Sequence, residues 1–265
     1  MVTVKNGTYI LLLEKIYGNK ISQLNALRSA RDILRREVGS LHLKRVETSI
    51  GMDGYLCVSI FGDDFHGAKN YLKWKFGSVI NFDELDVGDV RRGHLVSPGN
   101  VGFGIFVDIG VLNPRKDALL PLYVLREQLV NGKTFSLQQI VRIYGFLENF
   151  PVNVVVNSTD KDKGSIEVKL AKSSLELFEK WRHDRLERVI CYGASRHEVR
   201  RALVKAGALK DIYRIERLGL MEHAVACIFG INAKLLLQRI GPFLPAVSMS
   251  VFYTPTIRRI FSTSS

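Results

Sequence analysis

The sequence has few cysteines and no long apolar run. Its 265 residues include three cysteines, Cys57, Cys191 and Cys227, and no two of them have CxxC spacing. Scattered cysteines in odd number predict reduced thiols, and therefore a cytoplasmic protein without a zinc site. Apolar runs such as residues 9–13 and 119–122 are far shorter than the roughly 20 residues of a membrane-spanning helix. We therefore expect neither a metal nor a membrane partner.

Known catalytic motifs are also absent. The sequence contains no GxxxxGK[ST], GxSxG or HExxH motif and no dinucleotide-binding fingerprint. Acidic residues cluster at 83–89, where a solvated turn explains them better than a metal site does. The neighbouring pairs His183–Asp184 and His197–Glu198 diverge on a helix and form no catalytic pair. We expect no enzymatic activity and no cofactor.

Positive charge is what the sequence has in excess. It contains 38 Lys and Arg against 26 Asp and Glu, which gives a formal net charge of +12. Such an excess attracts polyanions, and nucleic acids above all. The densest basic stretch, residues 180–217, contains eleven Lys or Arg against five acidic residues. Most of the eleven are arginines, whose planar guanidinium suits the recognition of phosphate.

The chain divides into three segments, and the first, residues 1–82, predicts a ferredoxin-like N-terminal α/β domain. Strands are expected at residues 8–13, 43–49 and 55–61, and helices at residues 22–38 and 65–76. Asn19 or Ser22 is the expected N-cap of the first helix. The resulting order β-α-β-β-α lacks a clear last strand.

The second segment, residues 83–172, predicts a β-barrel. Strand-like alternation runs through LDVGDVRRGHLV, VGFGIFVDIG and DALLP, with glycines where a small barrel must bend. This pattern resembles the S1 domain, an OB-fold barrel of RNA-binding proteins. Two departures from the S1 pattern are Pro121, where many S1 domains have a histidine, and a helical insertion at residues 123–149.

The third segment, residues 173–265, predicts a linking helix at residues 173–188 and a C-terminal ferredoxin-like domain of βαββαβ order. Its expected strands are residues 188–192, 211–217, 223–229 and 246–252, and its expected helices are residues 195–206 and 232–240. Ser195 and Glu198 have the spacing of a capping box. Residues 254–265 are expected to be a tail. The predicted fold class is therefore α+β, with an S1-like OB barrel between two ferredoxin-like domains.

RNA contacts are expected on the barrel, because OB folds place aromatic faces for base stacking beside positive charge. Phe103 and Phe106 are three residues apart and should face opposite sides of a regular strand. We expect Phe103 to be exposed and Phe106 to lie in the core. The expected phosphate contacts are Arg91, Arg92, His94, Lys161, Lys163 and Lys169. The alternative, that these are ordinary polar positions of a solvated barrel, remains open.

A second set of RNA contacts is expected in the arginine-rich third segment. Its members are Arg185, Arg188, Arg196, Arg200 and Arg201. Arg196 and Arg200 share one face of the expected helix at residues 195–206. The alternative is that arginines here form surface ion pairs, such as Arg201 with Glu198 or Arg182 with Glu187.

The whole chain also resembles an archaeal protein family of unknown function, through the stretches LLPLYVLREQL, FLENFPV, LERVICYGASRHEVRRAL and IERLGLMEHAVACIFG. In arrangement it is similar to the alpha subunit of archaeal initiation factor two and to the stalk subunit of archaeal RNA polymerase. We expect a non-catalytic RNA-binding protein of translation, whose partners are rRNA, tRNA or ribosomal subunits. The alternative is a protein–protein adaptor in transcription or ribosome biogenesis that uses the barrel as a docking module.

Overall fold

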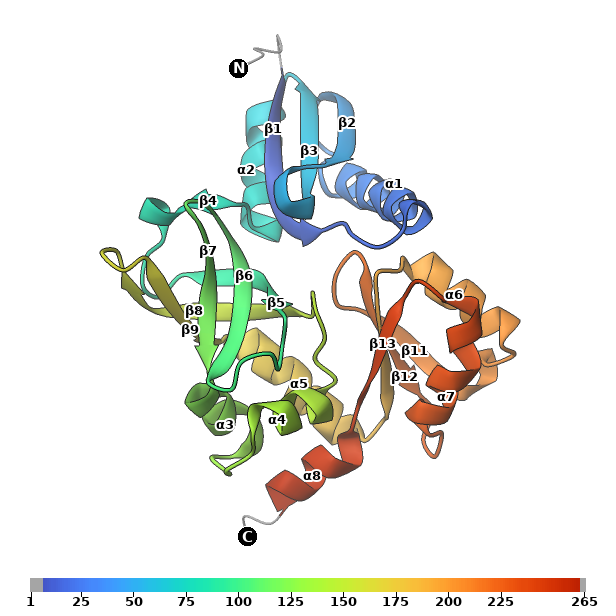
Figure 1. Ribbon diagram of the computed structural model, residues 1–265. Coiled ribbons are helices and arrows are strands. Elements are labelled where there is room, and N and C mark those ends of the chain that lie inside the picture. Colours follow the sequence, from blue (N-terminus) through green and yellow to red (C-terminus); the bar gives the residue numbers. More distant parts are fainter. Residues whose placement is uncertain (1–6, 263–265) are drawn as a thin grey trace.

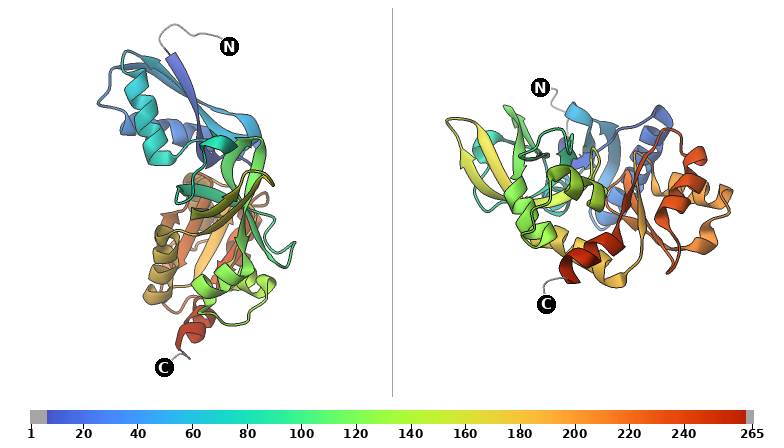
Figure 2. Two further views of the ribbon diagram at one scale, coloured as in Figure 1. Left: turned by 90° about the vertical axis from the view of Figure 1, so that its left-hand side faces the viewer. Right: turned by 60° about the horizontal axis from the view of Figure 1, so that its bottom comes forward.

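The protein is a mixed α+β structure with three β-sheets. The computed structural model describes residues 7–262, so the first six and last three residues of the expected outer domains lie outside it. Figure 1 shows three lobes, which are an N-terminal lobe, a central barrel and a C-terminal lobe, and Figure 2 shows them from two further sides. Within the part of the chain that the structure describes, no helix is both long and apolar enough to span a membrane.

The N-terminal lobe is a three-stranded antiparallel sheet with two helices. Its elements are β1 (Gly7–Lys15), α1 (Lys20–Glu37), β2 (Leu43–Ile50), β3 (Tyr55–Gly62) and α2 (Phe65–Phe76). The strand order is β1-β3-β2, and apolar residues of both helices and the sheet form one core. Asn19 is the N-cap of α1, because its side chain accepts a hydrogen bond of 2.9 Å from the Ser22 N–H. The expected β-α-β-β-α order is present in these residues.

The central lobe is a closed five-stranded barrel. Its strands are β5 (Val90–Val96), β6 (Gly104–Asn113), β7 (Arg115–Pro121), β8 (Pro151–Asp160) and β9 (Ser165–Leu170), and the two-residue β4 (Ile80–Asn81) pairs with β6 from outside. The order β6-β5-β8-β9-β7 closes through pairing of β6 with β7. A Cβ added at Gly93 would lie 2.6 Å from Cγ1 of Val107. Glycine is therefore required where these strands approach closely inside the barrel.

The expected insertion forms two short helices, and α5 then connects the barrel to the C-terminal lobe. The three helices are α3 (Leu122–Val130), α4 (Leu137–Tyr144) and α5 (Lys172–Asp184). Ser136 and Gln139 form a capping box at the start of α4. The apolar faces of α3 and α4 are buried in the same core as the barrel interior. The insertion is therefore packed inward through most of its apolar side chains, whereas Tyr123 is 62% exposed.

The C-terminal lobe is a four-stranded antiparallel sheet of βαββαβ order. Its elements are β10 (Arg188–Tyr192), α6 (Arg196–Lys205), β11 (Ile212–Arg217), β12 (Glu222–Cys227), α7 (Ala233–Ile240), β13 (Ser248–Phe252) and α8 (Thr254–Ser262). The strand order is β11-β12-β10-β13. The predicted capping box of Ser195 and Glu198 is confirmed at the start of α6.

Both faces of the C-terminal sheet are buried at its central strands, β10 and β12. Val189 and Cys191 of β10 pack with α6 and α7, whereas Ile190 and Tyr192 face the core of the barrel. Alternate residues of one strand thus enter two cores, as the period of two in a strand requires. Figure 1 shows α5 leading from beneath the barrel to this sheet. The barrel and the C-terminal lobe consequently share a continuous apolar core.

Two predicted boundaries in the third segment are wrong. The linking helix ends at Asp184 and not at residue 188, because Arg185 has a left-handed φ of 61°. The expected tail is a helix over most of its length, α8, and only its last three residues lie outside the described range. Burial of Ile257 and Ile260 explains why residues 254–262 are helical, since packing of an apolar face stabilises a short helix.

Arg188 lies fully inside the protein, so its predicted contact with RNA is wrong. Its guanidinium is 0% exposed and pairs with Asp184 and with Glu216, the latter at 3.2 Å. It also lies 4.8 Å above the ring of Trp181, whose indole N–H donates to Glu216 at 2.6 Å. Burial of a charge is tolerated only where partners compensate it. These contacts join the end of α5 to β10 and β11.

We predict that Arg188→Ala lowers the free energy of unfolding by about 3 kcal/mol, because it removes a fully buried guanidinium from its ion pairs with Asp184 and Glu216 and leaves Arg214 as the ion-pair partner of these two partly buried carboxylates. Denaturant titration followed by tryptophan fluorescence measures the change. Arg196→Ala, on the exposed face of α6, is the matched control and should change stability by less than about 0.5 kcal/mol. An Arg188 variant as stable as the control would show that the network does not hold this junction together.

Candidate nucleic-acid interface

A hollow lined by four arginines and one histidine lies between the end of α5 and helix α8. It has a volume of about 460 Å³. The residues that line it are Arg182, His183, Arg185, Pro255, Arg258, Arg259, Phe261 and Ser262. No carboxylate is among these residues of the described chain. We call this hollow the arginine pocket.

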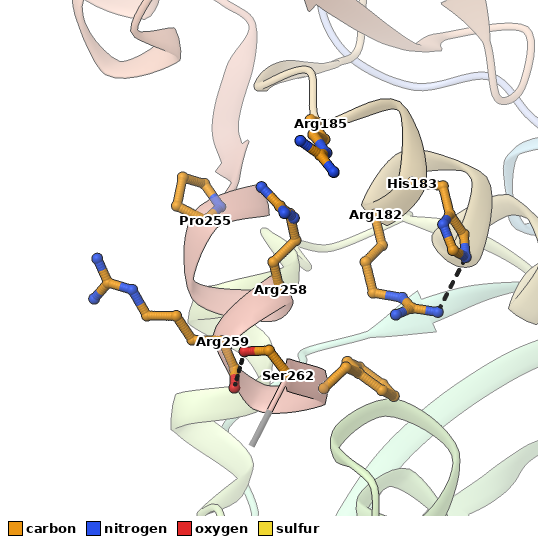
Figure 3. Close-up of a pocket in the computed structure, with 8 residues that line it drawn as sticks. Arg182, His183, Arg185, Pro255, Arg258, Arg259 and Ser262 are labelled. Atoms are coloured by element: carbon orange, nitrogen blue, oxygen red, sulfur yellow. Dashed lines mark hydrogen bonds between the residues drawn. The ribbon is translucent and has the colours of Figure 1, made fainter. Parts of the chain in front are cut away.

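Two guanidinium groups of the arginine pocket are directed toward one another. Figure 3 shows the side chains of Arg185, from the turn after α5, and Arg258, from α8, converging, while Arg259 extends to the other side. Neither Arg185 nor Arg258 has an ion pair within residues 7–262, and both are exposed. Like charges that converge without a counterion favour binding of an anion between them. Phosphate is the anion that such a pair of planar, five-donor groups recognises well.

Arg182, also in the pocket, contacts an aromatic ring of α8. Its guanidinium lies 4.5 Å from the ring centroid of Phe261 and 3.4 Å from Glu179. A cation over an aromatic face stabilises the contact between the two elements. Arg182 therefore fixes α8 against α5, and the ion pair with Glu187 that the sequence left open is not formed.

The turn between α5 and β10 places both walls of the pocket. The left-handed conformation of Arg185 ends α5 and directs the chain back toward the sheet. The Thr254 hydroxyl donates a hydrogen bond of 2.8 Å to the carbonyl of Leu186, which fixes the start of α8 to the same turn. The two segments that form the pocket are therefore fixed to one another at this turn.

The predicted arginines of α6 form a second basic surface. Arg196, Arg200 and Arg201 are exposed, and none has an ion pair in the described structure. The expected alternative, a pair of Arg201 with Glu198, is not formed, because Glu198 accepts hydrogen bonds from Ser195 and from Ser22 of α1 at 2.9 Å. These arginines therefore keep their donors free for a partner.

The aromatic pair of the barrel differs from its prediction in one respect. Phe103 is 57% exposed, as predicted, but Phe106 is half-buried and not part of the core. The two rings meet edge to face, with centroids 6.1 Å apart. Strand alternation does not apply to the pair, because β6 begins at Gly104, one residue after Phe103. Both rings therefore lie on the same side.

The predicted lysines of the barrel are exposed, but they do not gather around Phe103. Lys161 and Lys163 occupy the turn between β8 and β9, and Lys163 pairs with Asp160 at 3.6 Å. This turn lies near Lys116 at the start of β7, whereas Phe103 lies near the end of β7, beside Leu122. Lys169, near the end of β9, is the predicted lysine that is nearest to the end with Phe103.

Arg91 and Arg92 are used within the protein, so their predicted roles as phosphate contacts are wrong. Arg91 donates to the carbonyls of Ser78 and Ile109 at 2.7 and 3.0 Å. Arg92 donates to the carbonyl of Leu218 at 2.6 Å and pairs with Glu14 at 3.0 Å. Both guanidinium groups therefore join the barrel to its neighbours.

His94 is buried, and its predicted contact with RNA is also wrong. Burial lowers the pKa of His94 to about 3, and the charges of Arg92 and Lys15 act in the same direction. Beside it in the fold, Asp108 pairs with Lys15 at 2.5 Å and accepts a hydrogen bond from Tyr55. His94 is thus a neutral interior residue at the contact of the barrel with the N-terminal lobe.

A polar junction holds the three lobes together. Glu14 of β1 accepts from the N–H of Leu220 at 3.1 Å and pairs with Arg92 of the barrel. Tyr17 donates a hydrogen bond of 2.5 Å to the buried Glu222 of β12. Burial raises the pKa of Glu222 to about 8, although the hydrogen bond from Tyr17 lowers it. Residues from all three lobes therefore meet through titratable groups.

No group of three His, Cys, Asp or Glu side chains within residues 7–262 is placed to hold a metal ion. The three cysteines are free thiols, and burial raises the pKa of Cys191 and of Cys227 to about 12. Such thiols are poor nucleophiles at neutral pH because the thiolate is the reactive form. Anion binding is the chemistry that the exposed groups of the arginine pocket support.

Two domain models of one family match the sequence. The DUF2110 central domain matches residues 85–182, and the DUF2110 C-terminal domain matches residues 186–252. Together they match more than half of the chain, which therefore belongs to the DUF2110 family. A search among curated proteins finds no match.

Solved structures are similar to parts of the chain. An uncharacterized protein from Methanocaldococcus jannaschii is 13% identical, with a TM-score of 0.23, over 34% of this chain and 96% of that one. A chain of the a/eIF2alpha–aDim2p–rRNA complex from Pyrococcus horikoshii OT3 is 14% identical, with a TM-score of 0.26, over 49% of this chain and 70% of that one. Similarity at this level carries no argument about function.

Sequence reasoning missed two features of the arginine pocket. Arg258 was assigned to a tail, although Pro255 in the first turn and Ile257, Ile260 and Phe261 at helical spacing are signals of a short amphipathic helix. The convergence of Arg258 with Arg185 has no sequence signal, because 73 positions of chain separate them. Only the packing of α8 on α5 brings them together.

We predict a stability maximum near pH 6.5 from Glu222, His94 and His223. Because the pKa of Glu222 is raised, its contribution to the free energy of unfolding falls as the pH rises from 4.5 to about 8. Burial lowers the pKa values of His94 and His223 to about 3 and 4, so their contributions fall as the pH drops below 6.5. Chemical unfolding at a series of pH values measures the profile. Glu222→Gln should remove the decline above pH 6.5, and an unchanged decline in that variant would contradict this assignment.

Proposed function

We propose that the protein is a cytoplasmic, non-catalytic RNA-binding protein whose main phosphate-binding site is the arginine pocket. The observation that carries this proposal is the convergence of Arg185 and Arg258 in a pocket whose described lining contains no carboxylate. RNA presents closely spaced phosphates, and each phosphate contact releases condensed counterions. The net charge of +12 adds a long-range attraction for the same polyanion.

Two further surfaces support contacts along an extended RNA. The arginines of α6 offer unpaired guanidinium groups, and Phe103 offers an exposed ring at one end of the barrel. If the barrel binds RNA as an S1 domain does, an unpaired base would stack against Phe103 and Phe106. We take tRNA and rRNA as the first RNAs to test, and ribosomal subunits as the first assemblies.

The alternative to this proposal is that the protein is a protein–protein adaptor. The apolar faces of the insertion are buried against the barrel and the C-terminal sheet, so they are already occupied within the chain. If the wild-type protein binds neither tRNA nor rRNA at about 50 mM salt, where charges are only weakly screened, the proposal is wrong. A nuclease-resistant protein complex from the native host would then identify the docking function.

We predict that the double variant Arg185→Glu, Arg258→Glu binds tRNA about tenfold more weakly, because it removes two phosphate contacts and adds repulsion. The slope of log Kd against log salt should decrease by about 2, one for each lost contact. Fluorescence anisotropy with labelled tRNA at four salt concentrations measures both quantities.

Lys44→Glu, Arg45→Glu is the matched control for this experiment. Both residues are exposed on β2 of the N-terminal lobe, and the double substitution changes the net charge by the same amount. The control should keep the wild-type salt slope. Equal losses in the two double variants would show that only the overall charge matters, and would reject the arginine pocket as a defined site.

A further inference from the structure

A second hollow continues from the arginine pocket. It has a volume of about 300 Å³, and three of its lining residues, Arg185, Pro255 and Arg258, also line the arginine pocket. Its remaining wall is the loop of residues 228–232 between β12 and α7, together with Glu187 and Thr254. The two hollows therefore meet at the pair of arginines that we assign to phosphate binding.

The side chain of Phe229 lines this second hollow, and its ring is exposed to solvent. Phe229 is 82% exposed, the largest exposed fraction among the large apolar side chains of the described residues. No other aromatic ring or cation packs on it within residues 7–262. An aromatic face held in water beside guanidinium groups is the combination with which proteins bind unstacked bases.

The backbone around Phe229 is held in place, so the ring is presented from a fixed loop. The N–H of Ile228 donates to the carbonyl of Asp211 at 2.9 Å, and that of Cys227 donates to the carbonyl of Glu187 at 2.9 Å. Gly230 follows with a φ of 89°, which turns the chain sharply. The loop is thus attached both to the sheet and to the turn that carries Arg185.

The one carboxylate at the hollow is engaged. Glu187 accepts a hydrogen bond of 2.7 Å from the N–H of Ala233 at the start of α7, where the helix dipole favours a negative charge. Its charge is therefore partly compensated within the protein. The free charges that remain at the meeting point of the hollows are those of Arg185 and Arg258, which are positive.

We infer that the two hollows bind one strand of single-stranded RNA, with a base stacked on Phe229 and the adjoining phosphate between Arg185 and Arg258. This inference rests on the proposed function and adds the form of RNA that the site selects. A base inside a duplex is covered on both faces by its neighbours, so it has no free face for Phe229. A strand with unstacked bases can place a base on Phe229 and a phosphate between the two arginines at the same time.

The test compares Phe229→Ala with the wild-type protein on two probes, an unstructured 12-nucleotide oligouridylate and a 12-base-pair RNA duplex. We expect the variant to bind oligouridylate about 5- to 150-fold more weakly, the range of one lost stacking contact, and the duplex within about twofold of wild type. Phe229→Trp should keep the affinity for oligouridylate, and its added indole fluorescence should be quenched on binding. Thermal unfolding of both variants should match that of wild type, because the ring is exposed.

Trp74→Ala is the matched control, since Trp74 of α2 is 80% exposed and belongs to another lobe. It should leave both affinities unchanged. If Phe229→Ala has no effect while Arg185→Glu, Arg258→Glu weakens binding, the stacking inference is wrong and the proposed function stands. Equal losses on the two probes would also overturn the inference, since stacking on Phe229 acts on unpaired bases. Absence of RNA binding by the wild-type protein would overturn both.

Discussion

The buried guanidinium of Arg188 is the constraint on which the rest of this surface depends. A charge without access to water requires compensation, and Asp184 and Glu216 supply it from two different elements. Their positions determine where α5 ends and where β10 begins. The intervening turn carries Arg185, whose side chain is consequently directed outward, and Glu187, which holds the start of α7. Both hollows of the proposed RNA site are therefore shaped around a single interior ion-pair network.

The arginines of this chain serve two purposes that composition cannot separate. Arg91, Arg92 and Arg188 donate to backbone carbonyls or to carboxylates of the chain and hold the lobes together. Arg185 and Arg258 make no such contacts in the described structure and face solvent. The net charge of +12 thus counts both groups alike, although the internal arginines are not available to a polyanion. A basic composition indicates a nucleic-acid partner only after the internal arginines are set aside.

The sequence predicts most elements because their signals are local. Helical spacing, the Asn19 cap and the capping box at Ser195 depend on residues within one or two turns, and the structure agrees with them. The exposure of a side chain, in contrast, depends on packing between distant parts of the chain. His94 lies on a strand of mixed polarity, and only the packing of the N-terminal lobe against the barrel buries it. Alternation likewise failed at Phe103, because the start of β6 depends on pairing with β7. Site residues were therefore harder to predict than elements.

The two kinds of contact between lobes differ in their dependence on pH. The N-terminal lobe is joined through Glu14, Arg92, Tyr17 and Glu222, and burial raises the pKa of Glu222 to about 8. The barrel and the C-terminal lobe share an apolar core that includes α5 and α8. Apolar packing is insensitive to pH, so the relative placement of the helices around the arginine pocket does not depend on the polar junction. Deprotonation of Glu222 can therefore loosen the junction of the N-terminal lobe without changing the apolar core in which α5 and α8 pack.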